Sequence, residues 1–207
     1  MNPKKDLYLH ENSLISTGVN YICGVDEVGR GSLAGPVVAA AVVMPKNLII
    51  DGVDDSKKLT SAKREYFYKI ISKSALNMGI GIIEEKVIDY LNILKATYLA
   101  MQKALSNLTF QPDYILVDAL KIPEINIPQK PIIHGDQLSH TIACASIIAK
   151  VTRDKIMDNY HQEFSKYGFN KHKGYGTKTH LQAIKDFGIC RIHRQTFAPI
   201  SNLLPLN

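Results

Sequence analysis

Tyr21-Ile22-Cys23-Gly24-Val25-Asp26-Glu27-Val28-Gly29-Arg30-Gly31 is an apolar stretch that ends in two adjacent acids and a glycine-rich turn. A strand of this composition is normally buried, and ionised carboxylates in it would cost several kcal/mol each unless a cation or hydrogen bonds compensate. We therefore interpret Asp26 and Glu27 as candidate metal ligands. Neighbours on a regular strand point to opposite faces, so Glu27 can join Asp26 only if the strand ends or bulges there.

Strands and helices alternate along the rest of the chain, with the segment 29–35 read as a hairpin-like turn after the first strand. Apolar runs predict strands, and apolar residues at helical spacing or a capping residue predict helices. Strands are expected over 21–26, 36–44, 78–83, 112–118 and 130–134, and helices over 61–76, 86–107, 138–164 and 179–187. This order predicts an α/β fold.

Two further acids accompany the later strands. Asp118 ends one strand, and Asp136 lies between another strand and the long helix that follows. Strand ends of an α/β sheet can converge on one edge, so we expect both to meet Asp26 and Glu27 there. An all-oxygen ligand set suits Mg²⁺ or Mn²⁺, and two such ions about 3.5–4 Å apart support phosphoryl chemistry. A solvated strand end or, for Asp136, a helix cap is the alternative for each acid alone.

Composition and length bound the class of protein. With 207 residues, 45% of them hydrophobic, the chain can form one core, and a single domain over residues 1–207 is expected. No run approaches the roughly 20 apolar residues of a membrane span, so we expect a cytoplasmic protein without a membrane partner. The three cysteines lack any paired spacing and suggest neither disulfides nor a zinc site.

The net charge of +6 is unevenly distributed. Residues 1–144 hold 15 Lys and Arg against 15 Asp and Glu, whereas residues 145–207 hold 10 against 4. A basic C-terminal third combined with an acidic cluster near the N-terminus suits a phosphodiester substrate. An ordinary solvated basic face is the alternative, and composition alone favours it.

The glycine-rich segment and later motifs together resemble the ribonuclease HII family. The resemblance covers about residues 20–199, and the matching segments keep the family's order and spacing. They are Gly24-Val-Asp-Glu-Val-Gly-Arg-Gly-Ser-Leu-Ala-Gly-Pro36, Asp55-Ser-Lys-Lys-Leu59, Leu91-Asn-Ile-Leu94, Val117-Asp118, Gly135-Asp136, Ala145-Ser-Ile-Ile-Ala-Lys-Val-Thr-Arg-Asp154 and His172-Lys-Gly-Tyr-Gly176.

The resemblance implies a fold and an activity. The fold would be an RNase H-like mixed sheet flanked by helices, with an N-terminal extension over about 1–19 and a small basic helical region over about 165–207. The activity would be metal-dependent endonucleolytic cleavage of RNA in RNA–DNA hybrids, and cutting on the 5′ side of a single ribonucleotide in duplex DNA. A monomer with Mn²⁺ or Mg²⁺ in a two-metal site is expected.

The resemblance also assigns site residues. Asp26, Glu27, Asp118 and Asp136 fall on the four catalytic, metal-binding acids of the family. Gly29, Arg30 and Gly31 match the loop whose backbone reads the ribose 2′-hydroxyl, which only glycine lets approach closely. Tyr175 matches the tyrosine that packs on the adjacent deoxyribose. Phosphate contacts, which position a duplex without reading its sequence, are expected from Ser56, Lys57, Lys58, Lys150, Arg153 and Lys173.

Some residues depart from the family pattern or lack an assigned role. Ser32 replaces the usual proline, Ala119 the usual glycine and Cys144 the usual alanine, and none of these changes removes a charged site residue. His172, His180 and His193 lack paired ligand spacing and are read as surface residues or phosphate contacts at best.

Two alternatives compete with ribonuclease HII. Ribonuclease HIII shares the fold but usually carries a sizeable N-terminal domain and a glutamate as its fourth acid, whereas here about 20 residues precede the first strand and that acid is Asp136. A non-catalytic nucleic-acid-binding module would explain the basic tail but not the four acids.

Overall fold

A central five-stranded sheet organises the chain in the computed structural model, which describes residues 7–53 and 56–203. Its strand order is β3-β2-β1-β4-β5. β1 pairs antiparallel with β2 and parallel with β4, β2 pairs antiparallel with β3, and β5 extends β4 in parallel. The strands span Ile22–Val28, Val37–Val43, Asn77–Ile83, Tyr114–Asp118 and Gln129–Ile132. All five expected strands and the mixed α/β sheet are thereby confirmed, with ends that shift by a few residues.

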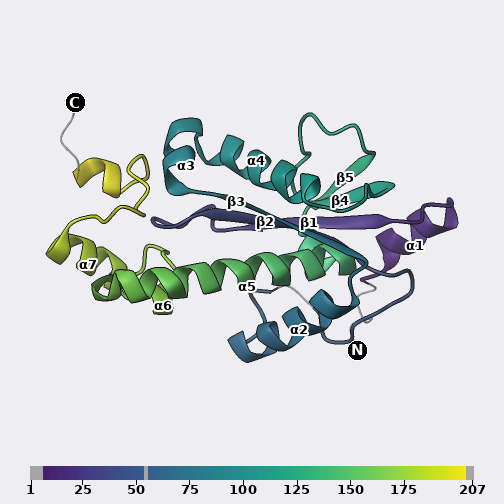
Figure 1. The fold of residues 1–207 in the computed structure, drawn as a ribbon, viewed down its shortest axis with the longest axis horizontal. Helices are drawn as coiled ribbons and strands as arrows, with labels where there is room; N and C mark the ends of the chain where they lie inside the picture. Colours follow the sequence, from purple (N-terminus) through teal and green to yellow (C-terminus); the bar gives the residue numbers. More distant parts are fainter. Residues whose placement is uncertain (1–6, 54–55, 204–207) are drawn as a thin grey trace.

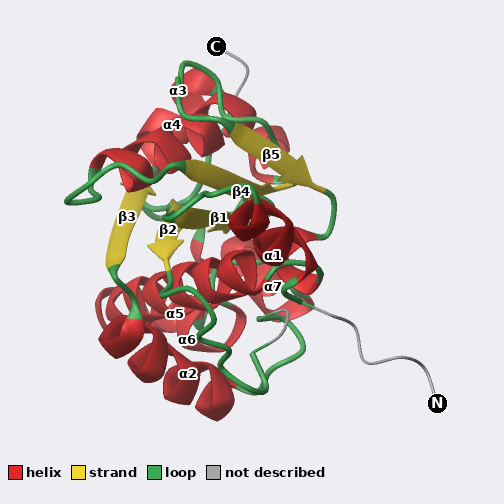
Figure 2. Cartoon of the chain, turned by 90° about the vertical axis from the view of Figure 1, so that its right-hand side faces the viewer, coloured by secondary structure: helices red, strands yellow, loops and turns green. Residues whose placement is uncertain are grey.

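Helices cover both faces of the sheet (Figures 1 and 2). α4 (Ile93–Ser106) packs on β3 and β2, while α5 (His140–Glu163) packs on β1 and β2 from the other side and also carries α2 (Ser61–Ser74). The remaining elements are α1 (Leu9–Ser16), α3 (Glu85–Leu91), α6 (Phe169–His172), α7 (Lys178–Phe187) and the 3-10 turns η1 (Gly135–Gln137), η2 (Ser165–Tyr167) and η3 (Ile200–Leu203). None of the helices in the described ranges is both long and apolar enough to cross a bilayer.

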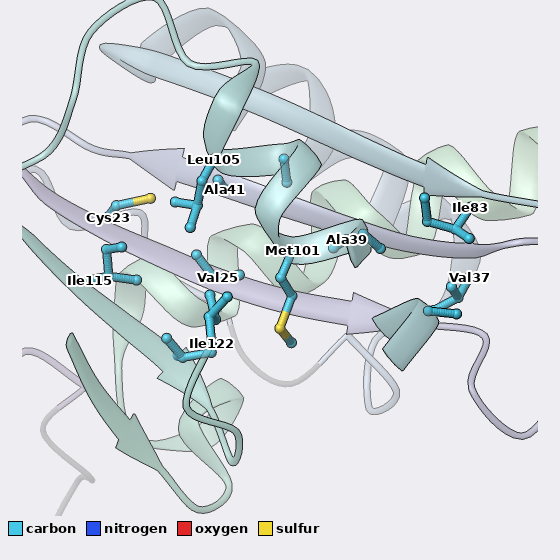
Figure 3. Close-up of a cluster of buried hydrophobic side chains, with 14 of the residues drawn as sticks. Cys23, Val25, Val37, Ala39, Ala41, Ile83, Met101, Leu105, Ile115 and Ile122 are labelled. Atoms are coloured by element: carbon cyan, nitrogen blue, oxygen red, sulfur yellow. The ribbon is translucent and has the colours of Figure 1, made fainter. Parts of the chain in front are cut away.

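The strands contribute to two apolar layers because alternate residues face opposite sides. Cys23 and Val25 of β1 pack toward Met101 of α4, together with Ile115 and Ile122 (Figure 3). The other layer joins alternate residues of β2 to the apolar face of α5. β2 is buried along its entire length, which its Val-Val-Ala-Ala-Ala-Val-Val sequence predicts.

The close approach of α5 to β1 depends on Gly24. A Cβ atom at this position would lie 2.2 Å from the backbone carbonyl of Thr141. Ser139 caps the helix by accepting a hydrogen bond from the N–H of Ile142. The first turns of α5 are therefore held directly against the strand that carries Asp26.

The structure corrects one predicted helix and adds another. The helix expected over 86–107 is broken at Asn92, whose φ is 74°, because its side chain caps the new helix α4 through the N–H groups of Leu94 and Lys95. α1 was not foreseen in the N-terminal extension. Leu14 and Ile15 of this helix and Val19 after it pack beside Ile22 at the end of the sheet, and Glu11 is buried.

Candidate active site

Asp26 and Asp118 lie on adjacent parallel strands at the C-terminal side of the sheet. The β1–β4 ladder pairs Val25 with Val117, so the two acids follow one position later on both strands and share the face that α5 covers. Asp26 is 5% exposed, and its Oδ1 atom accepts a hydrogen bond from the Glu27 N–H at 2.7 Å, while Ser146 of α5 borders the same pocket. A carboxylate oxygen of Asp118 accepts a hydrogen bond from the Gly135 N–H at 2.7 Å.

Glu27 lies on the strand without the bulge that sequence analysis required. β1 pairs residue for residue with β2 through Val28, so Glu27 starts toward the face opposite to Asp26. Its Oε1 atom lies 3.2 Å from Nη1 of Arg30 in the loop after β1. Glu27 and Asp26 nevertheless border the same open pocket of about 360 Å³, whose other lining residues are Val28, Ser56, Lys57, Arg64, Ser146, Lys150 and Tyr175.

Asp136 lies in η1, immediately after Gly135. The Gly135–Asp118 hydrogen bond therefore ties this turn to the end of β4. Asp136 is 3% exposed, and its Oδ2 atom lies 3.6 Å from Nζ of Lys57. The helix cap that sequence analysis kept as an alternative is supplied by Ser139 instead, so capping does not account for Asp136.

The electrostatics of the acids favour a cation. Burial and then the charges of Glu27 and Asp118 raise the pKa of Asp26 well above its usual range. Burial also raises the pKa of Glu27, although the Arg30 ion pair opposes the change. A bound cation would reverse this penalty because it favours the ionised form of each carboxyl group.

The donor set fits a hard divalent cation in chemistry. The side chains of Asp26, Glu27, Asp118 and Asp136 offer only oxygen atoms, and Glu27 Oε2 is buried without a hydrogen-bond partner. Within residues 7–53 and 56–203, however, no three His, Cys, Asp or Glu side chains gather closely enough to form a ready metal cage. Asp26 and Glu27 line the pocket, Asp118 lies beside Asp26 on the neighbouring strand, and Asp136 pairs with Lys57 of the pocket lining.

Gly29 and Gly31, in the loop between β1 and β2, have different packing requirements for glycine. Gly29 has a φ of 92°, and a Cβ there would lie 2.2 Å from Nε of Arg153. Gly31 has no such requirement within the described residues, since a Cβ there would meet no atom within 4 Å apart from those of its chain neighbours. The packing of the protein explains glycine at position 29 but leaves position 31 unexplained.

Tyr175 borders the pocket and is only partly buried, so it is not a core aromatic residue. Its ring centroid lies 5.5 Å from the guanidinium carbon of Arg153 and 6.0 Å from Nζ of Lys150. Its carbonyl oxygen lies 3.0 Å from Nδ1 of His180, and its N–H donates to the carbonyl of His172. Two histidines therefore hold the turn that presents Tyr175.

The surface role expected for three histidines is wrong. His172, His180 and His193 are buried: the rings of His172 and His180 stack at 4.4 Å, and Nε2 atoms of His180 and His193 lie 3.1 Å apart. Burial lowers the pKa of both His180 and His193 to about 4. Their helical and loop segments bring these side chains together, and no local spacing in the sequence announces it.

The expected phosphate contacts separate into three groups. Arg153 is fully buried and donates to backbone carbonyls, so the structure gives it an internal role in place of a phosphate contact. Lys150 and Lys173 are ion-paired with Asp154 and Asp158, and both are mostly buried. Three others remain candidates: the exposed Lys57 and Lys58, and Ser56, whose buried hydroxyl lies 2.8 Å from that of Ser146.

Arg64 and Ser146 also border the pocket, although sequence analysis did not select them. Arg64 of α2 donates to the carbonyls of Ser56 and Leu59 and so supports the lysine segment. Ser146 lies within the Ala145–Asp154 motif, which was the available signal for it.

The three departures from the family pattern have distinct surroundings. Ser32 is buried, donates to the Gly29 carbonyl and accepts from Arg153. Ala119 adopts a left-handed φ of 53° directly after Asp118. Cys144 is buried in α5, with Sγ 3.9 Å from Nδ1 of His140.

Comparisons with known proteins agree on the family. The family model described as Ribonuclease HII matches residues 23–200. A ribonuclease HII from Bacillus cytotoxicus is 50% identical over 208 residues, which is 99% of this chain and 80% of that protein. The ribonuclease H2 structure from Pyrococcus horikoshii superimposes with a TM-score of 0.74 at 25% identity, covering 88% of this chain and 96% of that one.

A more distant structure shares the fold. Bst-RNase HIII, solved in complex with Mn²⁺, gives a TM-score of 0.69 at 18% identity over 97% of this chain and 74% of that one. At this identity the likeness concerns the fold alone.

Proposed function

We propose a specific cleavage reaction for this chain, which belongs to the ribonuclease HII family and is a ribonuclease H-type hydrolase. It cleaves RNA in RNA–DNA hybrids and nicks duplex DNA 5′ of a single embedded ribonucleotide. The products are a 3′-hydroxyl and a 5′-phosphate. The observation that carries the proposal is that Asp26 and Asp118 lie side by side on β1 and β4, while Asp26 and Glu27 line one open pocket.

Two Mg²⁺ or Mn²⁺ ions would be held by Asp26, Glu27, Asp118 and Asp136. When bound, such ions supply an activated water and stabilise the leaving oxygen of a phosphodiester. The protein's own part is to hold the acids. The Glu27 N–H orients Asp26, and the Gly135 N–H orients Asp118. The unpartnered Oε2 atom of Glu27 is the ligand position that the protein itself leaves unsatisfied.

Recognition of the ribose is assigned to the loop of Gly29, Arg30 and Gly31. The absence of any internal reason for glycine at position 31 supports a close approach of the sugar to this backbone. The 2′-hydroxyl is the group that distinguishes RNA from DNA at one position. Tyr175 lines the same pocket as Asp26 and Glu27 and is assigned to pack on the neighbouring deoxyribose.

Phosphate contacts with the duplex are assigned to two exposed lysine side chains. Lys57 has a 77% exposed side chain beside Asp136, and Lys58 is also exposed. Contacts from such residues position phosphates without reading sequence. A cytoplasmic monomer that acts on hybrids and on ribonucleotide-containing duplexes completes the proposal.

The test is a nicking assay on two duplexes of one sequence, one with a single ribonucleotide and one of DNA alone. With Mn²⁺ or Mg²⁺ the first is cut 5′ of the ribonucleotide and the second survives. Asp118→Asn keeps an oxygen to accept the Gly135 N–H, so it should fold normally yet lose at least about 100-fold in rate, because a metal ligand loses its charge. Asp113→Asn, at the other end of β4, is the matched control and should cut like the wild type.

Two outcomes would contradict the proposal. An intact ribonucleotide duplex would favour a non-catalytic binding module, and full activity of Asp118→Asn would remove the two-metal assignment. A third arm with a long hybrid addresses ribonuclease HIII, because strong cutting of the hybrid without nicking at a single ribonucleotide would favour that activity.

A further inference from the structure

The loop between β1 and β2 is held by two buried arginines from distant parts of the chain. Arg194 Nη2 donates to the carbonyls of Gly29 and Gly35 at 2.6 and 2.8 Å, Nη1 to that of Arg30 at 2.8 Å, and Nε to that of Gly35 at 3.0 Å. Arg153 donates to the carbonyls of Ala34 and Pro36. Carbonyl groups along this loop therefore point into the protein.

Carbonyl groups, not carboxylates, are the direct partners of these two guanidinium groups in the described part of the chain, although Asp89 and Glu85 favour the charged form of Arg194 from a greater distance. Both are 0% exposed, and neither forms an ion pair among the residues that the structure describes. Burial lowers the pKa of Arg194 to about 9, which still leaves the group charged at neutral pH. A buried cation without a directly paired counter-charge is costly unless dipoles replace it. Here the dipoles are the loop carbonyls, so the guanidinium and the loop conformation depend on each other.

The backbone of the Arg194 segment is fastened to the same loop. The N–H of Arg194 donates to the Leu33 carbonyl, and the N–H of Gly35 donates to the Ile192 carbonyl, both at 2.8 Å. Ala34 and His193 form an isolated antiparallel bridge. The C-terminal region thus pairs its backbone with the loop, and the side chain of Arg194 extends from this segment to the carbonyls of Gly29 and Arg30.

The opposite side of the loop is left open. Arg30 and Gly31 are exposed, and their N–H groups donate to no backbone or side-chain acceptor in the described part of the chain. With the carbonyls turned inward, these N–H groups and the Cα of Gly31 form the outer surface beside Glu27.

We propose that Arg194 is a positioning residue for ribose recognition: by binding the carbonyls of Gly29, Arg30 and Gly35 it fixes the peptide planes that face the 2′-hydroxyl. The inference rests on the proposed function, in which this loop reads the ribose. It extends that function by giving the C-terminal region a specificity role. Lysine cannot replace arginine here. The three carbonyl oxygens accept from different nitrogen atoms of the planar guanidinium group, whereas lysine has a single nitrogen atom.

The experiment compares Arg194→Lys with the wild type and with Arg191→Lys. Arg191 lies three residues away, is exposed and pairs with Glu163 at the surface, so it is the matched control. Binding is measured in Ca²⁺ to two duplexes of one sequence, with and without a single ribonucleotide, and steady-state nicking is measured in Mn²⁺. Thermal unfolding verifies that each variant is folded.

We expect Arg194→Lys to lose at least tenfold in its preference for the ribonucleotide duplex and to raise KM by a similar factor. Its affinity for the DNA duplex should stay within about twofold of the wild type, because phosphate contacts are untouched. Arg191→Lys should behave as the wild type. A folded Arg194→Lys that keeps the wild-type preference overturns the inference.

A milder variant covers the case in which Arg194→Lys does not fold. Ser32→Ala removes one hydrogen bond to the Gly29 carbonyl, at 2.9 Å, and one acceptor of Arg153. It should lower the ribonucleotide preference several-fold with kcat nearly unchanged, and an unchanged preference would count against the inference. Failure of the wild-type protein to distinguish the two duplexes is a different result, since it would remove the proposed function and this inference with it.

Discussion

Asp26 and Asp118 are neighbours across the β1–β4 pair, one position beyond Val25 and Val117, on the face of the sheet that α5 covers. The half-buried Asp118 therefore lies beside the buried Asp26, and the charge of Asp118 contributes to the raised pKa of Asp26. The protein holds like charges together at a cost to its own stability, which is a common feature of sites that bind cations.

Asp26→Asn should stabilise the protein in a metal chelator while abolishing nicking. The substitution removes a buried charge, so the free energy of unfolding at pH 7 should rise by roughly 1 kcal/mol or more. Because the folded-state pKa of Asp26 is raised, the wild type loses this stability as pH rises from below about 4 toward neutrality, and the difference from the variant should shrink in acid. Urea unfolding at several pH values measures it. The exposed Asp51→Asn is the control, and a destabilised Asp26→Asn would contradict the electrostatic account.

Gly31→Ala and Gly29→Ala should separate recognition from folding. At position 31 the added methyl group meets no protein atom within 4 Å, so the melting temperature should change little while nicking falls at least tenfold. At position 29 the methyl group meets Arg153 at a φ of 92°, and a loss of 1–3 kcal/mol of stability is expected. Calorimetry and the nicking assay together provide the comparison. Wild-type activity of Gly31→Ala would exclude a close approach of the ribose at that residue.

Ala119→Gly should stabilise the fold. Ala119 holds a left-handed φ of 53°, a conformation that costs an L-residue about 1 kcal/mol and glycine almost nothing. Glycine also makes the unfolded chain more flexible, which offsets part of this stabilisation. The free energy of unfolding should therefore rise by about 0.5 kcal/mol, and the melting temperature by roughly 1–2 °C. Ala62→Gly, on the exposed surface of α2, is the opposite control and should lose about 1 kcal/mol.

The histidine cluster should make the protein less stable in weak acid. His180 and His193 have folded-state pKa values of about 4, below the ordinary 6.5, so the unfolded chain takes up protons first as pH falls. Stability is then highest above pH 6.5 and declines toward pH 4, with each histidine contributing a slope of up to about 1.4 kcal/mol per pH unit.

His180→Gln tests the origin of that slope. Urea midpoints measured between pH 7 and pH 4 should fall less steeply for this variant than for the wild type. The exposed His134→Gln should retain the wild-type slope. Equal slopes for all three proteins would show that the cluster is not the source of the acid sensitivity.

Glu11→Gln should weaken the attachment of α1 to α5. Oε1 of the buried Glu11 accepts hydrogen bonds from the Ser139 hydroxyl and from the N–H and hydroxyl of Thr141. The amide retains an acceptor but loses the negative charge at a helix N-terminus, so a loss of about 1–2 kcal/mol is expected in urea unfolding. Glu65→Gln, which affects only a surface ion pair with Lys155, should cost less than about 0.5 kcal/mol.

The sequence by itself determined the α/β class and the five strands, and it singled out the four acids of the proposed site. Those features are local, because apolar runs predict strands and an acid at a strand end is visible in the sequence. The family could also be recognised from the sequence, since its motifs keep their order and spacing. Local patterns could not reveal the break at Asn92, because the apolar spacing continues across it while one side chain caps a new helix.

Only the tertiary structure decided which side chains meet. The adjacent acids Asp26 and Glu27 start toward opposite faces of β1, whereas Asp26 and Asp118, distant in sequence, share one face. Arg153 was expected to contact phosphate but is buried against loop carbonyls, and Arg194, which sequence analysis did not select, binds carbonyls of the same loop. Strand pairing and the burial of charged groups depend on contacts between segments that are distant in the sequence. Local sequence patterns do not predict these contacts.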